Sequence, residues 1–187
     1  MIADQAPAAS QLARSFPPIA DGRSRVLVLG SMPGGESLRA NQYYAHRRNA
    51  FWTIMSELLG FDAQLPYETR VRALRSAGIA LWDVLHSCKR DGSLDSSIEA
   101  ASETANDFRA FFQAHPAIRA VFFNGAKAQS AFEAHVRPAL ADLELRYQRL
   151  PSTSPAHAGM PVAMKLKAWR AVARARAPLS ERGRSRR

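Results

Sequence analysis

Four short runs of apolar residues punctuate the chain, and each has the length of a buried β-strand. The runs span residues 25–30, 79–85, 118–123 and 143–150. Continuous apolar runs of this length, bounded by turn residues, are typical of strands that are covered on both faces. The last run is less apolar than the other three, and we interpret it as a fourth strand.

Between these runs, apolar residues recur at the spacing of one helix face. Residues 49–59 show this pattern most clearly, and Gly60 follows them as a C-terminal cap. Ser102 is a candidate N-cap, and Pro161 suits the first turn of the last helix. The predicted helices span 49–59, 67–77, 102–114, 126–136 and 161–175, and the predicted long loops span 31–48, 85–95 and 151–160.

Strands that alternate with helices in this order predict an α/β fold with three layers, in which a central four-stranded parallel sheet lies between helices. The chain has 187 residues, which suits one globular domain. We expect an N-terminal extension over 1–24, a single domain over 25–176 and a basic C-terminal tail over 177–187.

This layout predicts where a ligand binds before any motif is considered. In open α/β sheets, ligands bind beyond the carboxyl ends of the strands. Asp83 and Asn124 follow strongly apolar stretches, so each must find a partner or a ligand. The alternatives are that Asp83 caps a helix or ties a loop, and that Asn124 with Gly125 forms a turn. The residues expected around one crevice are Ser31, Met32, Pro33, Asp83, Asn124, Ser152, Thr153 and Ser154.

Charge adds a class of partner. The formal net charge is +10, and nine of the 26 lysines and arginines lie between Lys165 and Arg187. A basic domain with a basic arm predicts attraction to polyanions, and to nucleic acid first. A solvated tail that only aids solubility is the alternative, and an anionic membrane surface is less favoured because the tail has no apolar face.

Composition excludes several other classes. The single cysteine, Cys88, excludes an intramolecular disulfide framework, a four-cysteine iron–sulfur cluster and a cysteine-based zinc ribbon. No run approaches 18 apolar residues, so we expect no transmembrane helix. The N-terminus lacks the basic start and apolar core of a secretory signal. These features favour a cytoplasmic protein.

Familiar cofactor and nucleophile motifs are incomplete. The stretch from Gly30 to Ser37 has the outline of a phosphate-binding loop, but Glu36 stands where lysine is required. There is no dinucleotide-binding turn, no zinc deaminase signature and no serine hydrolase elbow. The five histidines are scattered without metal-ligand spacing. We expect neither a metal nor a cofactor.

The most distinctive segment is 30–55, which mixes aromatic and basic residues after the first strand. Tyr43 and Tyr44 precede Arg47 and Arg48, and two further aromatic residues follow. Aromatic rings beside basic groups suit a stacked nucleic-acid base with phosphates held nearby. The alternative is that these rings are ordinary core.

Five segments in order resemble the uracil-DNA glycosylase superfamily. Within it they look most like the hypoxanthine (deoxyinosine) branch, which is related to the mismatch-specific uracil and thymine glycosylases. The resemblance covers about residues 25–172. The segments are GSMPGGESL after the first strand, QYYAHRRNAFW (42–52), ALWDVLHSCKRDGSLDSSI (80–98), FFNGAKA (122–128) and LPSTSPAHA (150–158).

The resemblance implies a role for each segment. Tyr44 would stack on a base flipped out of DNA, and Asn49 would be the principal catalytic residue. Many superfamily members have Asp or Asn where this chain has Met32, and methionine can neither activate nor position water. The remaining base-pocket residues would be Ser31, Met32, Asp83 and Asn124, and the DNA-binding residues would be Ser152, Thr153, Ser154, His157, Arg47 and Arg48.

The implied reaction is hydrolysis of an N-glycosidic bond in base-excision repair, by a monomer acting on DNA that contains a deaminated base. Hypoxanthine offers an N1–H donor that a carboxylate at Asp83 can accept, but uracil has an imide N–H as well. Because asparagine is a poor base, catalysis would depend mainly on leaving-group stabilisation and positioning. The alternatives are a mismatch-specific uracil glycosylase, a nucleic-acid-binding module with weak catalysis, and a nucleotide-binding α/β enzyme.

Overall fold

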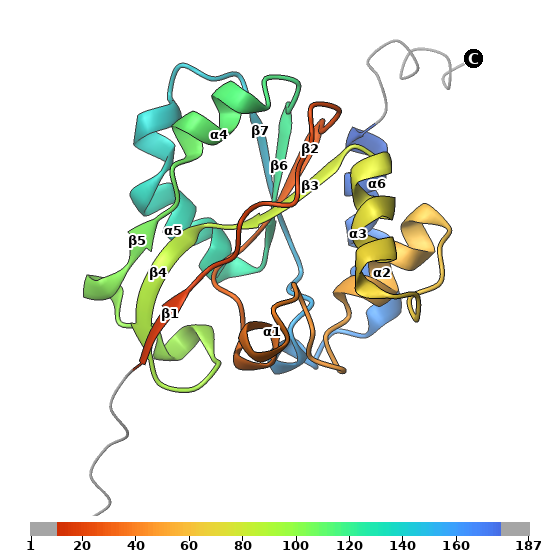
Figure 1. Ribbon diagram of the computed structural model, residues 1–187, viewed down its shortest axis with the longest axis horizontal. Coiled ribbons are helices and arrows are strands. Elements are labelled where there is room, and N and C mark those ends of the chain that lie inside the picture. The colour runs from red at the N-terminus through yellow and green to blue at the C-terminus, as the bar shows by residue number, and fades with distance from the viewer. Residues whose placement is uncertain (1–10, 177–187) are drawn as a thin grey trace, which may run out of the picture.

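A parallel β-sheet lies at the centre of the computed structural model, which describes residues 11–176 (Figure 1). Its strands are β2 (Val26–Gly30), β3 (Ile79–Asp83), β6 (Ala120–Asn124) and β7 (Arg146–Leu150). They run in the order β3-β2-β6-β7, and all three pairings are parallel. The predicted four-stranded parallel sheet is confirmed.

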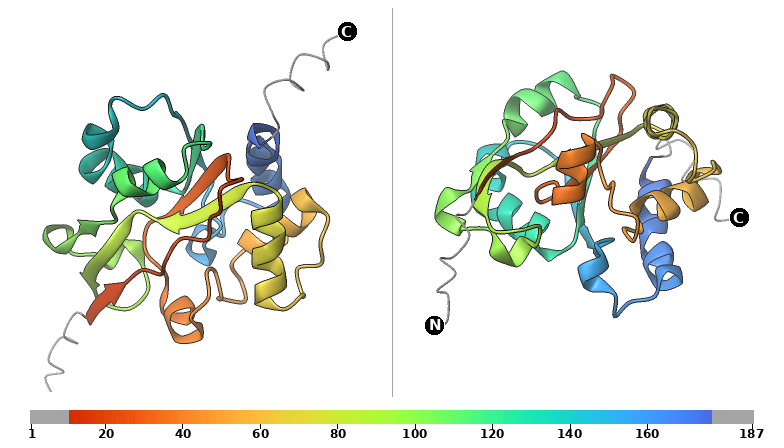
Figure 2. Two further views of the ribbon diagram at one scale, coloured as in Figure 1. Left: turned by 45° about the horizontal axis from the view of Figure 1, so that its top comes forward. Right: turned by 60° about the horizontal axis from the view of Figure 1, so that its bottom comes forward.

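Helices cover both faces of this sheet (Figures 1 and 2). One face carries α2 (Phe51–Leu59), α3 (Tyr67–Ser76) and α6 (Val162–Ala175), and the other carries α4 (Phe108–Ala114) and α5 (Ala126–His135). The short helix α1 (Gly35–Ala40) follows β2. Four 3₁₀ helices complete the set: η1 (Asp95–Ser97), η2 (Ala100–Ser102), η3 (Arg137–Leu140) and η4 (Pro155–His157).

The alternation of side chains along β2 explains why its sequence is apolar throughout. Val26 and Val28 pack in the cluster formed with α2, α3 and α6, whereas Leu27 and Leu29 pack in the cluster formed with α4 and α5. All four side chains are fully buried. A strand buried on both faces has no position for a polar side chain until it ends, and this pattern delivers the polar residues to the sheet edge.

A second, smaller sheet corrects the predicted loop over 85–95. It contains β1 (Gln11–Arg14), β4 (Leu85–Arg90) and β5 (Thr104–Ala105), in the antiparallel order β1-β4-β5. The buried positions of β4 are Leu85, Cys88 and Arg90. Because one of these is charged and their spacing is irregular, the sequence lacks the strict alternation that identifies a half-buried strand.

Residues 11–24, predicted as part of an N-terminal extension, pack against the domain. Beyond the pairing of β1 with β4, Ile19 forms a β-bridge with Leu81, and the Trp82 indole donates a hydrogen bond to the Phe16 carbonyl at 3.0 Å. The domain therefore includes this segment. Residues 1–10 and the basic tail 177–187 lie outside the described residues.

Three predicted boundaries also differ. The helix expected from Ser102 begins at Phe108, where the Asp107 carboxylate accepts a hydrogen bond from the Ala110 amide at 3.0 Å. The Ser102 hydroxyl instead accepts from the Lys89 amide, so it ties β4 to η2. The predicted loop 31–48 contains α1, and α6 begins one residue after Pro161, which occupies the N-cap position.

Candidate active site

The carboxyl ends of the four parallel strands lie along the lower edge of the sheet in Figure 1. Gly30 is in register with Asp83, and Asn124 is in register with Leu150. Turning that edge toward the viewer shows α1 and the segment before α6 around it (Figure 2, right). The residues expected around one crevice thus come from the correct edge, but their side chains differ in what they contact.

Asp83 is the most unusual of these residues. The residue is 3% exposed, and its carboxyl oxygen Oδ2 has no hydrogen-bond partner among the described residues. Burial, with a smaller contribution from the negative charge of Asp95, raises the pKa of Asp83 to about 8, and the positive charge of Arg90 opposes the shift. At neutral pH this group is therefore mainly a neutral carboxylic acid, which offers one donor and one acceptor.

Gly30 allows the Asp83 carboxyl group to lie against β2. A Cβ atom added at Gly30 would be 2.3 Å from Asp83 Oδ1 and 3.1 Å from the Tyr44 hydroxyl oxygen. Both polar groups therefore close over the end of this strand, and any larger residue would displace the carboxyl group.

Tyr44 combines a strained backbone with a fixed ring. Its φ of 54° is uncommon for a residue with a side chain. The ring stacks on Phe51 with centroids 4.1 Å apart and planes 23° apart. The buried hydroxyl oxygen has no hydrogen-bond partner among the described residues. Burial, followed by the charge of Asp83, raises the pKa of this phenol, and the nearby Asn124 side chain opposes the shift. Strain of this kind clusters at ligand sites.

The aromatic rings near Tyr44 belong to the hydrophobic core, whereas Tyr44 itself is partly accessible. Tyr43, Phe51 and Trp52 are all buried in the cluster around α2 and α6, so they are core residues. Tyr44 is only half-buried. Because Phe51 covers one face of the Tyr44 ring, a base that stacks on it must use the other face.

Asn49 lies two residues before the first residue of α2, next to the N-cap residue Ala50, and is half-buried. Its side-chain oxygen accepts a hydrogen bond from the Phe51 amide at 3.0 Å. This contact satisfies one of the free amides at the helix start, as a capping residue does. The same oxygen has a second lone pair for a ligand. Arg47 and Arg48 precede it and are exposed.

The segment after β7 is tied to the sheet through Asn124. The Asn124 amide donates to Thr153 Oγ1 and accepts from the Thr153 amide, both at 2.8 Å. The Thr153 carbonyl in turn accepts from the Ala50 amide at the start of α2. Asn124 therefore positions this segment, which leaves Ser152 and Ser154 half-buried and His157 exposed.

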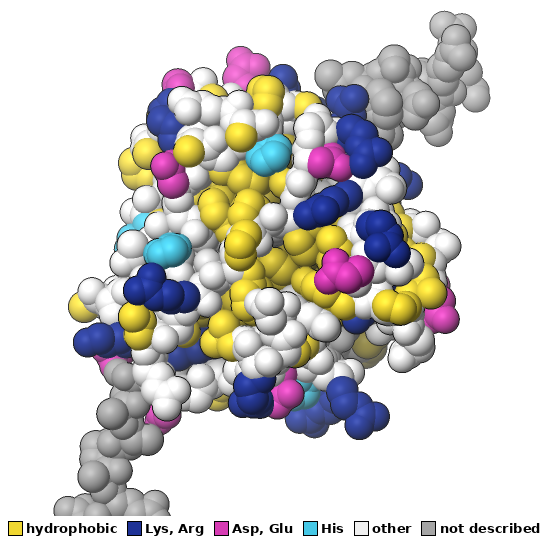
Figure 3. Space-filling view, viewed as in Figure 1, with side chains coloured by type: hydrophobic (Ala, Val, Ile, Leu, Met, Phe, Trp, Pro, Cys, Tyr) yellow, Lys and Arg dark blue, Asp and Glu magenta, His cyan; other side chains and the backbone are white. Residues whose placement is uncertain are grey.

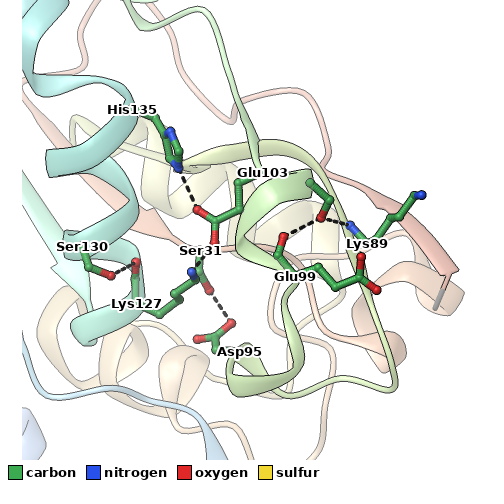
Figure 4. A network of polar contacts seen from close by, with 9 residues as sticks. Ser31, Lys89, Asp95, Glu99, Glu103, Lys127, Ser130 and His135 are labelled. Carbon is green, nitrogen blue, oxygen red and sulfur yellow. Dashed lines mark hydrogen bonds and ion pairs between the residues drawn. The ribbon is translucent and has the colours of Figure 1, made fainter.

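Met32 does not reach the crevice surface. It is 6% exposed and packs in the apolar cluster beside α4 and α5. The adjacent Ser31 instead donates a hydrogen bond to Asp95 Oδ1 at 2.6 Å (Figure 4). An asparagine introduced at position 32 would place an amide in that cluster, so it would cost stability as well as change chemistry.

Sequence analysis missed Arg90 and Asp95. Arg90 is 3% exposed and donates to the Pro33 carbonyl, while its Nη1 has no partner among residues 11–176. Both residues reach the loop after β2 because β4 directs the chain there. No regular alternation marks β4 in the sequence, so the sequence holds no signal for this approach.

Basic side chains border the same edge. Figure 3 shows Lys and Arg side chains along the lower margin of the molecule. Among the residues of the surrounding segments, Arg39, Arg47 and Arg48 are exposed. A positive margin beside a crevice favours a polyanionic ligand.

Two features are absent from the described residues. Residues 11–176 contain no group of three His, Cys, Asp or Glu side chains arranged to hold a metal ion. None of the helices in this part of the chain is long and apolar enough to span a membrane.

The fold and the site together define an α/β protein with a cluster of buried and half-buried polar residues at the carboxyl edge of a parallel sheet. The sequence model of the uracil DNA glycosylase superfamily matches residues 17–173. The chain belongs to this superfamily, and it is a DNA glycosylase.

Individual proteins give the same assignment. A hypoxanthine DNA glycosylase from Methanosarcina barkeri is 39% identical over 116 residues, which is 62% of this chain and 72% of that protein. Another from Methanosarcina acetivorans is 36% identical over 145 residues, which is 77% of this chain and 87% of that protein. The solution NMR structure of a candidate uracil DNA glycosylase from Methanosarcina acetivorans has a TM-score of 0.75 and 33% identity, and the match covers 89% of this chain and 99% of that one.

The buried Asp83 carboxyl group makes stability depend on pH. The native state binds this proton more tightly than the unfolded chain does, because the native pKa is raised to about 8. The free energy of unfolding therefore falls as pH rises from the ordinary aspartate range toward 8. In Asp83→Asn this loss is absent, so the variant gains at least about 1 kcal/mol on the wild type between pH 5 and pH 9.

Urea unfolding at both pH values measures this difference. Asp91→Asn, which changes an exposed carboxylate nearby, is the control and should show no such gain. If the free energy of unfolding of Asp83→Asn differs from that of the wild type by the same amount at pH 5 and pH 9, the account is contradicted.

Proposed function

We propose that this glycosylase removes hypoxanthine from DNA and leaves an abasic site, with uracil as the second candidate base. The observation that carries the proposal is the unpartnered Asp83 carboxyl group beside the unpartnered Tyr44 hydroxyl, at the end of β2. Two buried polar groups without partners are costly unless a ligand satisfies them. The names of the two Methanosarcina relatives support hypoxanthine as that ligand.

The chemistry of a neutral carboxylic acid matches hypoxanthine. Its O–H can donate to O6, and its carbonyl oxygen can accept from N1–H, so one side chain pairs with two adjacent atoms of the base. At neutral pH this is the predominant form, because burial raises the pKa of Asp83 to about 8. Uracil presents an equivalent pair of atoms, so Asp83 alone does not decide between the two bases.

Whether Asp83 rejects adenine depends on its protonation state. A neutral acid can also pair with adenine, which has an acceptor at N1 and an amino donor beside it, whereas an ionised Asp83 cannot donate to N1. Above the pKa of about 8, the ionised Asp83 carboxylate and the N1 lone pair of adenine repel each other, so the site rejects adenine. Below it, selection rests on base flipping, since a mismatched hypoxanthine leaves the helix at lower cost than a paired adenine.

The surrounding residues supply the remaining roles. The free face of the half-buried Tyr44 ring would stack on the flipped base. Exposed Arg47 and Arg48 would contact phosphates on one side of the crevice. On the other side, Asn124 holds the segment containing Ser152, Thr153, Ser154 and His157 for the same purpose. The monomeric state and the cytoplasmic location stay predictions.

A base-release assay tests the function. Oligonucleotide duplexes with a single hypoxanthine, uracil or mismatched thymine are incubated with excess protein, and abasic sites are then cleaved with alkali. We expect release from the hypoxanthine duplex to be fastest. Faster release from uracil duplexes would identify a mismatch-specific uracil glycosylase instead, and binding without release would identify a nucleic-acid-binding module.

Asn49 variants separate catalysis from helix capping. If Asn49 contacts the reacting water or sugar, Asn49→Ala lowers single-turnover release of hypoxanthine by about 10²–10³-fold and leaves DNA affinity nearly unchanged. Loss of the hydrogen bond to the Phe51 amide also costs about 1 kcal/mol of stability. Asn49→Ser retains a cap oxygen, so it should recover stability without activity. Full activity in a folded Asn49→Ala protein would leave capping as its role.

A further inference from the structure

The loop after β2 offers no free acidic group to the reaction. Hydrolysis of an N-glycosidic bond passes through a sugar with oxocarbenium character, and a nearby negative charge stabilises it. Met32 is apolar and lies in the core. Glu36 in α1 is ion-paired with Arg39 on the surface. Asn49 carries no charge, so a carboxylate beside the sugar would have to come from another segment.

The end of β4 and the connection that follows it contact the loop after β2 and the first residue of α1 at three places. Arg90 donates to the Pro33 carbonyl, the Gly35 amide donates to Ser93 Oγ at 3.0 Å, and Ser31 Oγ donates to Asp95 Oδ1 at 2.6 Å. These contacts fix the connection relative to the end of β2. Asp95 is consequently held beside the loop although it is far from it in sequence.

Asp95 is exposed and is anchored to the loop after β2 through one carboxylate oxygen. The residue is exposed, whereas its partner Ser31 is 7% exposed. Figure 4 shows the carboxylate meeting Ser31 at one oxygen. Its other oxygen, Oδ2, makes no hydrogen bond or ion pair within residues 11–176. The negative charge of Asp95 contributes to the raised pKa of both Asp83 and Tyr44, so it acts on the same crevice.

We propose that Asp95 is a catalytic residue of this glycosylase, and that it takes the place of the acidic or amide group that position 32 lacks. The inference rests on the proposed excision of a base from DNA. It assigns the carboxylate Oδ2 to the sugar and the attacking water, and it leaves base recognition to Asp83.

The step balances with water alone. The bond between C1′ and the base nitrogen breaks, and its electron pair leaves with the base. The oxygen of water bonds to C1′, and one proton of that water passes to Asp95 Oδ2. This proton returns to solvent, and the departing base takes up one proton, from solvent or from the neutral Asp83 carboxyl group.

The two carboxyl groups differ in the way such a division of roles requires. Asp83 is buried and its pKa is raised to about 8, so it is neutral and can donate to the departing base. Asp95 is exposed, so its carboxylate is open to solvent and to a ligand. One buried and one exposed acid in different environments are a recurrent arrangement in enzymes that cleave glycosidic bonds.

Asp95→Asn tests the charge and preserves the structure, because the amide oxygen can still accept from Ser31. We expect single-turnover release of hypoxanthine to fall by about 10²–10³-fold. Asp91→Asn is the matched control, since it removes the same charge from an exposed position four residues away and should keep the wild-type rate. A folded Asp95→Asn protein with the wild-type rate would overturn the proposal.

A binding measurement tests the same charge without catalysis. A duplex with a cationic pyrrolidine abasic-site analogue imitates the charged sugar, and a tetrahydrofuran analogue is its neutral counterpart. The wild type should prefer the cationic duplex, and Asp95→Asn should lose about tenfold of that preference. A preference that Asp95→Asn retains would contradict the proposal. If the wild type releases no base from any duplex, the proposed function is wrong. The ratio of the two binding affinities tests the charge of Asp95 separately, because it does not depend on base release.

Discussion

A carboxyl group without a partner imposes the main constraint on this site. Asp83 ends a strand that is buried on both faces, and its Oδ2 finds no donor among the described residues. An ionised carboxylate there would lose its hydration without compensation, so the group holds its proton to about pH 8, which is its raised pKa. Gly30 leaves room for this carboxyl group at the end of β2, and the Tyr44 hydroxyl lies over the same glycine. A ligand with a complementary donor and acceptor would satisfy the unpartnered oxygen.

The two sheets have separate tasks around that group. The parallel sheet brings Gly30, Asp83 and Asn124 to one edge, which is a consequence of its strand order. The smaller antiparallel sheet carries β4 past the loop after β2, and there it places Arg90 and Asp95. In the proposed mechanism the parallel sheet therefore supplies base recognition, and the segment that follows the smaller sheet's β4 supplies the charge.

The sequence predicted the parallel sheet and its polar edge because a strand buried on both faces is apolar until it ends. It could not predict β1, β4 and β5, since their buried positions include Arg90 and follow no regular alternation. Asp83 and Asn124 looked alike in the sequence, but Asn124 is paired with Thr153 and Asp83 has no partner. Which way Met32 points depends on packing between distant segments, and so does the approach of Asp95 to Ser31.

The protonation state of Asp83 is the central claim, and it can be observed directly. In protein labelled with ¹³C at the aspartate carboxyl carbon, the Asp83 resonance is assigned by its absence in Asp83→Asn. Its chemical shift is then followed against pH in the free protein. The account predicts a midpoint near 8, which is the raised pKa of Asp83. A midpoint near 4, the range of an exposed aspartate, would show that the carboxyl group is ionised at neutral pH and would contradict the account.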